Sequence, residues 1–277
     1  MIDTGIADQK RTDGWLQGLK EGDNVDPLDA FPEDHFLDRA AGHGTFCAGI
    51  VQQVAPAAQL VVSRELDSDG IGYELDVAVR MVVEAERGLR AGQHVVINLS
   101  LGAETADDER PVGFSVAMEV LEELQLEYRK RGKHSLKGQD LEVMVVAAAG
   151  NHGRTRDFFP AALPSVVAVT ALTQGLRPAT WSSNGPWADV CTIGEGVRST
   201  FVEGTESPTV DPRPDSFPVN SWALWSGTSF AAPQVAGAIA QIATDQSVGL
   251  VEAKRRLLDG APEVPLYGKR VEILPAI

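Results

Sequence analysis

The chain has 277 residues, which is long enough for one large α/β domain with a substantial core. Its 39 acidic and 24 basic residues give a formal net charge of −15, and this negative field would repel nucleic acid and anionic membranes. Neither is therefore an expected partner. No stretch of the sequence approaches the ~20 apolar residues of a membrane span, and no basic-then-apolar signal peptide opens it.

Two cysteines are too few for a disulfide framework or a cysteine-based metal site. Cys47 lies in the run of small and apolar residues from Thr45 to Ile50, where a buried thiol behaves as a small hydrophobe. We expect Cys47 and Cys191 to be free thiols. They would pair only if the fold brought them together.

The first 40 residues are rich in Asp, Gly and Pro and predict mostly loop, with a short helical piece at 16–20. Small and apolar residues at 43–54 then predict a tightly packed buried helix, and residues 59–63 predict a short buried strand. Residues 67–70 resemble a fragment of a calcium-binding loop, but the remaining ligands and the distal Glu are missing. We expect a solvated turn there.

Strands and helices alternate through the rest of the chain. Residues 74–91 predict a helix from the helical spacing of the apolar residues Leu75, Val79, Val82 and Val83. The further predicted helices are 114–130 (ended by Gly132), 229–244 and 251–259, and the further predicted strands are 94–99, 143–149 and 166–172. This alternation predicts a parallel sheet covered by helices on both faces. A Pro-rich segment at 204–220 predicts a surface loop, and with no repeat and no linker we expect residues 1–277 to form one domain.

Three short segments each join a reactive side chain to small residues. Asp3 lies in Ile2-Asp3-Thr4-Gly5-Ile6, where a carboxylate can orient a histidine. His43 lies between Gly42 and Gly44, and Ser229 in Gly227-Thr228-Ser229-Phe230-Ala231-Ala232-Pro233 would open a helix whose N-terminal amides favour negative charge. Taken singly, these segments are a turn, a structural histidine and a helix cap.

The order of the three segments carries more information than any one of them. Asp, His and Ser follow one another in the order found in subtilisin, which differs from the order in chymotrypsin and in the α/β-hydrolases. Between His43 and Ser229, the apolar run from Val145 to Gly150 ends at Asn151. A side-chain amide there can donate to the oxyanion of a tetrahedral intermediate, together with the Ser229 N–H.

The chain resembles the subtilases, the subtilisin-like family of serine peptidases. The segments that carry the resemblance run in order along the chain: Ile2–Ile6, His43–Thr45, Asn98–Gly102, Ala147–Asn151, Trp181–Trp187 and Gly227–Pro233. The resemblance implies a three-layer subtilisin-like α/β fold with a mostly parallel central sheet. It also implies a serine endopeptidase with Asp3, His43 and Ser229 as the triad and Asn151 as oxyanion donor.

Further expectations rest on the resemblance alone. Ser100, Leu101 and Gly102 resemble the extended edge that pairs with the substrate backbone. Ala148, Ala149 and Gly150 resemble one wall of the pocket for the residue preceding the cleaved bond, and their small side chains would leave room for a large one. No cofactor or catalytic metal is expected, and structural calcium has no convincing site. The resemblance implies that the partner is a polypeptide substrate and that the chain is a monomer. It also implies that the protein is secreted or located on the cell surface.

The sequence departs from the family at its start. Only Met1 and Ile2 precede Asp3, whereas subtilases place this residue at the end of a longer central strand. We expect the sequence to lack the N-terminal strand, propeptide and signal of a longer protein, and the chain as given to fold poorly or to have weak activity.

Two hypotheses about specificity and function stay open at this stage. The acidic residues Glu104, Asp107, Asp108 and Glu109 follow the substrate edge and would either favour basic residues upstream of the cut or form a solvated loop. The alternative functions are a pseudo-peptidase that binds peptides without cutting them and a processing peptidase of narrow specificity.

Overall fold

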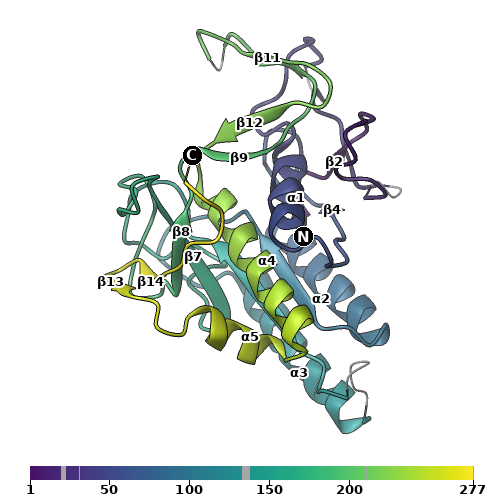
Figure 1. Ribbon diagram of the computed structural model, residues 1–277, viewed down its shortest axis with the longest axis vertical. Coiled ribbons are helices and arrows are strands. Elements are labelled where there is room, and N and C mark those ends of the chain that lie inside the picture. The colour runs from purple at the N-terminus through teal and green to yellow at the C-terminus, as the bar shows by residue number, and fades with distance from the viewer. Residues whose placement is uncertain (20–22, 31, 133–137, 210, 277) are drawn as a thin grey trace.

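The fold is built on an eight-stranded sheet, seen in a computed structural model that describes residues 1–277 except 20–22, 31, 133–137, 210 and 277 (Figure 1). In spatial order its strands are β13 (Glu263–Val264), β14 (Gly268–Arg270), β8 (Val190–Ile193), β7 (Val166–Leu172), β6 (Val143–Ala148), β5 (Val95–Leu99), β1 (Ile2–Asp3) and β4 (Ser63–Arg64). Every neighbouring pair is parallel except β13 with β14.

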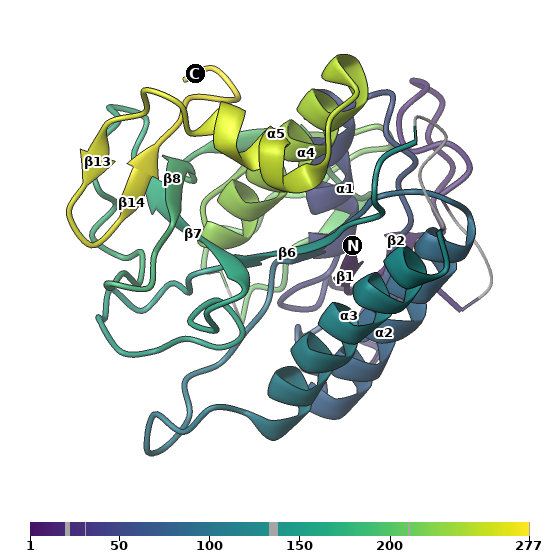
Figure 2. The same ribbon diagram turned by 90° about the horizontal axis from the view of Figure 1, so that it is seen from below.

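Helices cover both faces of this sheet. The helices α2 (Glu74–Arg90) and α3 (Val112–Lys130) lie on one face, and α1 (His43–Val54), α4 (Thr228–Gln246) and α5 (Leu250–Leu257) lie on the other (Figure 2). The alternation of side chains along β6 supplies both cores: Val145 and Ala147 pack with α2 and α3, and Val146 and Ala148 pack with α4 and α5. The predicted three-layer, mostly parallel α/β fold is confirmed.

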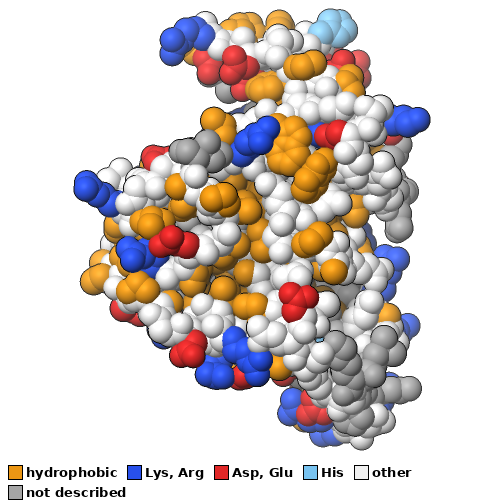
Figure 3. Space-filling model, viewed as in Figure 1, with side chains coloured by type: hydrophobic (Ala, Val, Ile, Leu, Met, Phe, Trp, Pro, Cys, Tyr) orange, Lys and Arg blue, Asp and Glu red, His pale blue; other side chains and the backbone are white. Residues whose placement is uncertain are grey.

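In the described part of the chain, three pairs of short strands lie outside the main sheet, one of them parallel and two antiparallel. They are β2 (Ile6–Ala7) with β3 (Val25–Asp26), β9 (Val197–Thr200) with β12 (Trp222–Trp225), and β10 (Gly204–Thr205) with β11 (Ser216–Phe217). The segment that holds β10 and β11 contains the predicted Pro-rich loop and projects at the top of Figure 1. On the face of the molecule seen in Figure 1, hydrophobic side chains gather in the middle and charged side chains lie mostly around the rim (Figure 3).

A cavity of about 420 Å³ opens beside the start of β1, and Met1, Leu60, His94, Val96, Asn98 and Ala236 are among the residues that line it. The Met1 amino group donates to the Val61 carbonyl at 2.8 Å, as a strand N–H would. Burial lowers the pKa of this amino group to about 6, although Glu84 and Asp3 act in the opposite direction. The first strand along the chain therefore begins with a partly buried amine beside an open cavity.

Two predictions about local structure are wrong. The expected strand at 59–63 is shorter and later, at Ser63–Arg64, and the part of 16–20 that the structure describes is turn, with Leu16 at a φ of 60°. The predicted helix at 74–91 is present as α2, although most of the apolar residues whose spacing indicated it do not form its buried face. Leu75, Val79 and Val83 are exposed, whereas the buried residues are Val77, Ala78, Met81, Ala85 and Leu89.

Candidate active site

The expected site residues converge at the carboxyl ends of three neighbouring strands. Asp3 ends β1, Ser100 follows β5, and Asn151 lies three residues beyond the end of β6. His43 is the first residue of α1, and Ser229 is the second residue of α4. The crevice outside the carboxyl ends of parallel strands is where α/β sheets commonly bind ligands, because loops and helix N-termini meet there.

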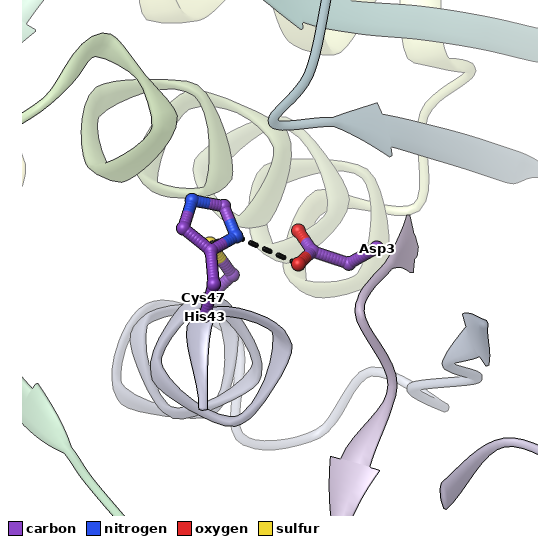
Figure 4. A group of neighbouring side chains, drawn as sticks. All are labelled: Asp3, His43 and Cys47. Atoms are coloured by element: carbon purple, nitrogen blue, oxygen red, sulfur yellow. Dashed lines mark hydrogen bonds and ion pairs between the residues drawn. The ribbon is translucent and has the colours of Figure 1, made fainter. Parts of the chain in front are cut away.

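Asp3 and His43 form a close pair. The Asp3 carboxylate is fully buried, and its Oδ1 lies 2.7 Å from His43 Nδ1 (Figure 4). The same Oδ1 accepts a hydrogen bond from the Thr4 N–H at 2.8 Å, and the buried Oδ2 has no hydrogen-bond partner among the described residues. With Asp3 on Nδ1, the imidazole nitrogen left for other chemistry is Nε2.

A second buried carboxylate holds this pair in place. Asp26 accepts hydrogen bonds from the Thr4 hydroxyl at 2.8 Å and from the Gly42 N–H at 2.9 Å, so it ties the residue after Asp3 to the residue before His43. Burial raises the pKa of Asp26 against the opposing effect of these donors. The α1 backbone also comes very close to the β1 turn, since a Cβ on Gly44 would lie 2.1 Å from a backbone oxygen. No sequence motif had indicated Asp26.

Burial and the neighbouring groups have opposite effects on the pKa of His43. Burial is the largest single effect and lowers this pKa, but the adjacent Asp3 carboxylate and Cys47 together raise it by more, so the net result is a pKa well above the usual value. Two aromatic rings enclose the imidazole on other sides: Trp225 at 5.7 Å between ring centroids and Phe230 at 5.3 Å. The His43 imidazole is therefore shielded by aromatic rings, and Asp3 stabilises its charged form.

Ser229 is half-buried at the start of α4, and a proline sets its surroundings. Its carbonyl would normally accept from the N–H four residues later, but that residue is Pro233, which has none. The Ser100 hydroxyl at 2.7 Å and the Cys47 thiol at 3.4 Å donate to this carbonyl instead. The Ser229 hydroxyl itself donates to the Ser100 carbonyl at 3.2 Å, and no hydrogen bond joins it to His43 in the described part of the chain.

Cys47 lies beneath the histidine. It is one turn along α1, fully buried, with Sγ 3.9 Å from His43 Nδ1. Burial raises the pKa of the thiol, so it is neutral at neutral pH. Asp3, His43 and Cys47 place potential metal-ligand atoms within 4.8 Å of one another, but a metal there would take the Nδ1 that Asp3 now binds. Cys47 and Cys191 are both free, as expected.

Hydrogen bonds to its oxygen fix the orientation of the Asn151 side-chain amide. Its Oδ1 accepts from the Thr228 N–H at 2.9 Å and from the Thr228 hydroxyl at 3.0 Å, and that hydroxyl accepts from the Gly150 N–H at 3.0 Å. Because the oxygen is engaged, Nδ2 is the atom left to face a ligand, and the residue is exposed. Thr228, which begins α4 next to Ser229, thus orients the side chain of Asn151, which follows the strand β6.

The two expected substrate segments face each other across a filled space. Ser100 is buried, Leu101 is half-buried and Gly102 is exposed, while Ala148, Ala149 and Gly150 are buried. The sequence predicted room beside the second segment for a large side chain. In the structure the phenyl ring of Phe158 occupies the space between Gly102 and Gly150.

The acidic loop after Gly102 is paired with a basic loop. Glu104 accepts from Arg154 at 3.0 Å and lies 3.5 Å from His152 Nδ1, and Asp108 pairs with Arg156 at 2.8 Å. Two of the four carboxylates that were candidates for binding basic substrates are thus engaged within the chain.

Comparison with known proteins identifies the family of this chain. The model of the subtilase family matches residues 1–259. The chain belongs to the subtilase family of serine peptidases. It is similar to a thermophilic serine proteinase of Bacillus sp. (strain AK1), with 32% identity over 259 residues that cover 88% of this chain and 51% of the relative. It is also similar to thermitase of Thermoactinomyces vulgaris, with 28% identity covering 88% of this chain and 74% of thermitase.

Solved structures of other proteases share the fold of this subtilase. The protease domain of PatA, solved as a mutant, superposes with a TM-score of 0.63 at 23% identity, covering 90% of this chain and 81% of that one. A protease from Pseudoalteromonas arctica gives 0.65 at 23% identity, covering 91% and 76%. The chain spans about half the length of several curated relatives, for example 54% of subtilisin E from Bacillus subtilis. No helix among the described residues is long and apolar enough to cross a membrane.

Proposed function

We propose that this chain is a serine endopeptidase in which Ser229 is the nucleophile, His43 the general base and Asp3 the residue that orients the base. The observation that carries the proposal is the buried Asp3 carboxylate 2.7 Å from His43 Nδ1, at the edge of the sheet where Ser229 and Asn151 also lie. A triad needs this arrangement, because the carboxylate selects the tautomer with Nε2 free and stabilises the imidazolium that forms during attack.

The reaction begins with a rotation of the Ser229 hydroxyl away from the Ser100 carbonyl, which it now contacts at 3.2 Å. His43 Nε2 takes the hydroxyl proton as Ser229 Oγ attacks the scissile carbonyl. Nδ2 of Asn151 and the Ser229 N–H at the start of α4 donate to the oxyanion. His43 then gives the proton to the leaving amine, and water repeats the cycle on the acyl-enzyme.

The proposed substrate is a polypeptide, with its backbone beside Ser100, Leu101 and Gly102. The chemistry uses side chains of this chain and needs no metal or cofactor. By analogy with the family, we propose that the protein acts outside the cell or at its surface, as a monomer.

A fluorophosphonate probe tests the proposal, because it reacts only with an activated serine. We expect labelling of the full chain at Ser229, located by peptide mass mapping, and hydrolysis of an unstructured protein substrate. Ser229→Ala should abolish both. Ser226→Ala is the matched control, since this exposed serine lies three residues away and should leave both unchanged.

A folded chain that neither labels nor hydrolyses, while still binding peptides, would overturn the proposal and favour the non-cutting peptide binder. Folding is checked independently by circular dichroism and by a cooperative thermal transition.

A further inference from the structure

The ring of Phe158 spans the gap between the two expected substrate segments. A Cβ built on Gly102 would lie 2.4 Å from Cε1 of the ring, and a Cβ built on Gly150 would lie 2.8 Å from Cδ2. That Cβ on Gly150 would also lie 2.9 Å from both Cγ and Cε2, so the ring presents its face to Gly150 and its Cε1 corner to Gly102. The ring is therefore in close contact with both glycines.

The ring is buried rather than loosely placed. The Phe158 side chain is only 6% exposed, and its carbonyl accepts from the Ala162 N–H at 2.9 Å. The next residue, Phe159, exchanges two backbone hydrogen bonds with Ala103, both 2.9 Å, so the chain at Phe158 is tied to the end of the first segment. Swinging the ring out would expose a large apolar surface and is therefore unfavourable.

Ion pairs close the same gap from the outside. The loop after Gly102 is joined to the loop after Asn151 by Glu104 with Arg154 and by Asp108 with Arg156. The His152 ring lies 6.3 Å from the Phe158 ring between centroids. The two segments are thus held together on either side of a ring that already occupies the space between them.

We propose that Phe158 determines specificity by filling the pocket for the residue that precedes the cleaved bond, so that the site accepts Gly, Ala or Ser there and rejects large side chains. This inference rests on the proposed function. The physical reason is steric: an aromatic or branched side chain would need the volume of the Phe158 ring, and both flanking positions are glycines pressed against that ring. A small side chain needs no such space.

The test is a pair of fluorogenic peptides, identical except for Ala or Phe before the cleaved bond. For the unaltered chain we expect kcat/KM to be at least about 10-fold higher for the Ala peptide, since even one methylene in a tight pocket changes it roughly 10- to 200-fold. In Phe158→Ala we expect kcat/KM for the Phe peptide to rise at least about 10-fold, with a change below about 3-fold for the Ala peptide.

Phe114→Ala is the matched control, because Phe114 is also a phenylalanine with 6% exposure but lies on α3 among the residues beneath the sheet. It should lower the thermal transition as Phe158→Ala does and leave the preference for Ala unchanged. If Phe158→Ala does not fold, Phe158→Leu, which retains most of the apolar volume, should give a smaller shift in the same direction.

A binding arm separates this inference from the proposed function. In a Ser229→Ala background, which cannot form an acyl-enzyme, peptides ending in Ala or Phe are titrated by fluorescence anisotropy. We expect the Ala peptide to bind more tightly, and Phe158→Ala to remove that difference. If the unaltered chain does not hydrolyse peptides but the binding pattern is observed, the proposed function is wrong and the role of Phe158 in the pocket is retained. Equal use of the two peptides, or a preference that Phe158→Ala leaves unchanged, would overturn the role of Phe158.

Discussion

The charge on one imidazole governs what the proposed site can do at a given pH. Attack by Ser229 requires neutral His43, and the Asp3 carboxylate holds the pKa of His43 well above its ordinary value against the effect of burial. Activity should therefore be low where the imidazole is protonated and rise as the pH increases through this raised pKa.

Replacement of Asp3 tests this relation. In Asp3→Asn the charge that raises the His43 pKa is gone, so the rising limb of the pH profile should move to lower pH. At the same time kcat should fall by about 10⁴-fold, as in other triads that lose the orienting carboxylate. The measurement is kcat/KM across about pH 5 to 11. Asp245→Asn, an exposed change on α4, is the control; a limb that stays in place in Asp3→Asn contradicts the assigned charge effect.

Among elements, the start of α4 depends on groups from outside that helix. Pro233 removes the intrahelical donor to the Ser229 carbonyl, and Ser100 and Cys47 supply donors from the end of β5 and from α1. The position of the proposed nucleophile is therefore fixed by three elements together rather than by helix geometry alone.

A double-mutant cycle measures this dependence. Ser100→Ala should lower the free energy of unfolding by about 1–3 kcal/mol, because it removes the shorter of the two hydrogen bonds to the partly buried Ser229 carbonyl. In a Pro233→Ala background the cost should be smaller, since the introduced alanine has an N–H that can donate to the same carbonyl. Denaturant titrations of the four proteins give the coupling energy, and purely additive changes would contradict the arrangement.

The sequence predicted the alternation of elements well, because long apolar runs such as 143–149 and 166–172 are typical of buried parallel strands. The spacing of apolar residues indicated the helix α2 but not its buried face, because that helix carries apolar residues on two sides. Only packing against α3 and the sheet decides that Val77 and Met81 are buried while Val79 is exposed.

For the site, sequence motifs marked the residues that are candidates for chemistry and missed those that position them. Asp26 ends β3 and Phe158 lies in the loop after β6, and nothing in their neighbouring residues signals their contacts at the site. Thr228 lay within a recognised motif, but its bonds to Asn151 depend on how β6 and α4 meet. Such contacts follow from tertiary geometry, which local patterns do not encode.

For the whole molecule, a free amine at Met1 in a chain prepared to start there links stability to pH, because burial lowers the pKa of that amine. Its pKa is about 6 in the folded chain, against 8.0 for a free amine, so between these values the unfolded chain binds more protons than the folded one. The free energy of unfolding should then rise with pH across this window, by up to about 3 kcal/mol.

Comparison with the Nα-acetylated chain isolates this contribution. The acetylated chain has no charge to desolvate and retains the N–H that reaches Val61, so the rise that Met1 contributes should be absent from it. The difference between the two chains, measured by denaturant titration at pH 6 and pH 8, is the quantity of interest. It should be largest at the lower pH, and a difference that does not depend on pH contradicts the effect of burial.

The position of Met1 also has a practical consequence for handling the protein. Its amine donates to Val61 at the edge of the 420 Å³ cavity, so an affinity tag fused directly to Met1 would begin beside this cavity and two residues before Asp3. The composition of the first few tag residues then matters. Apolar residues can bury part of their surface in the cavity, whereas charged residues favour solvent.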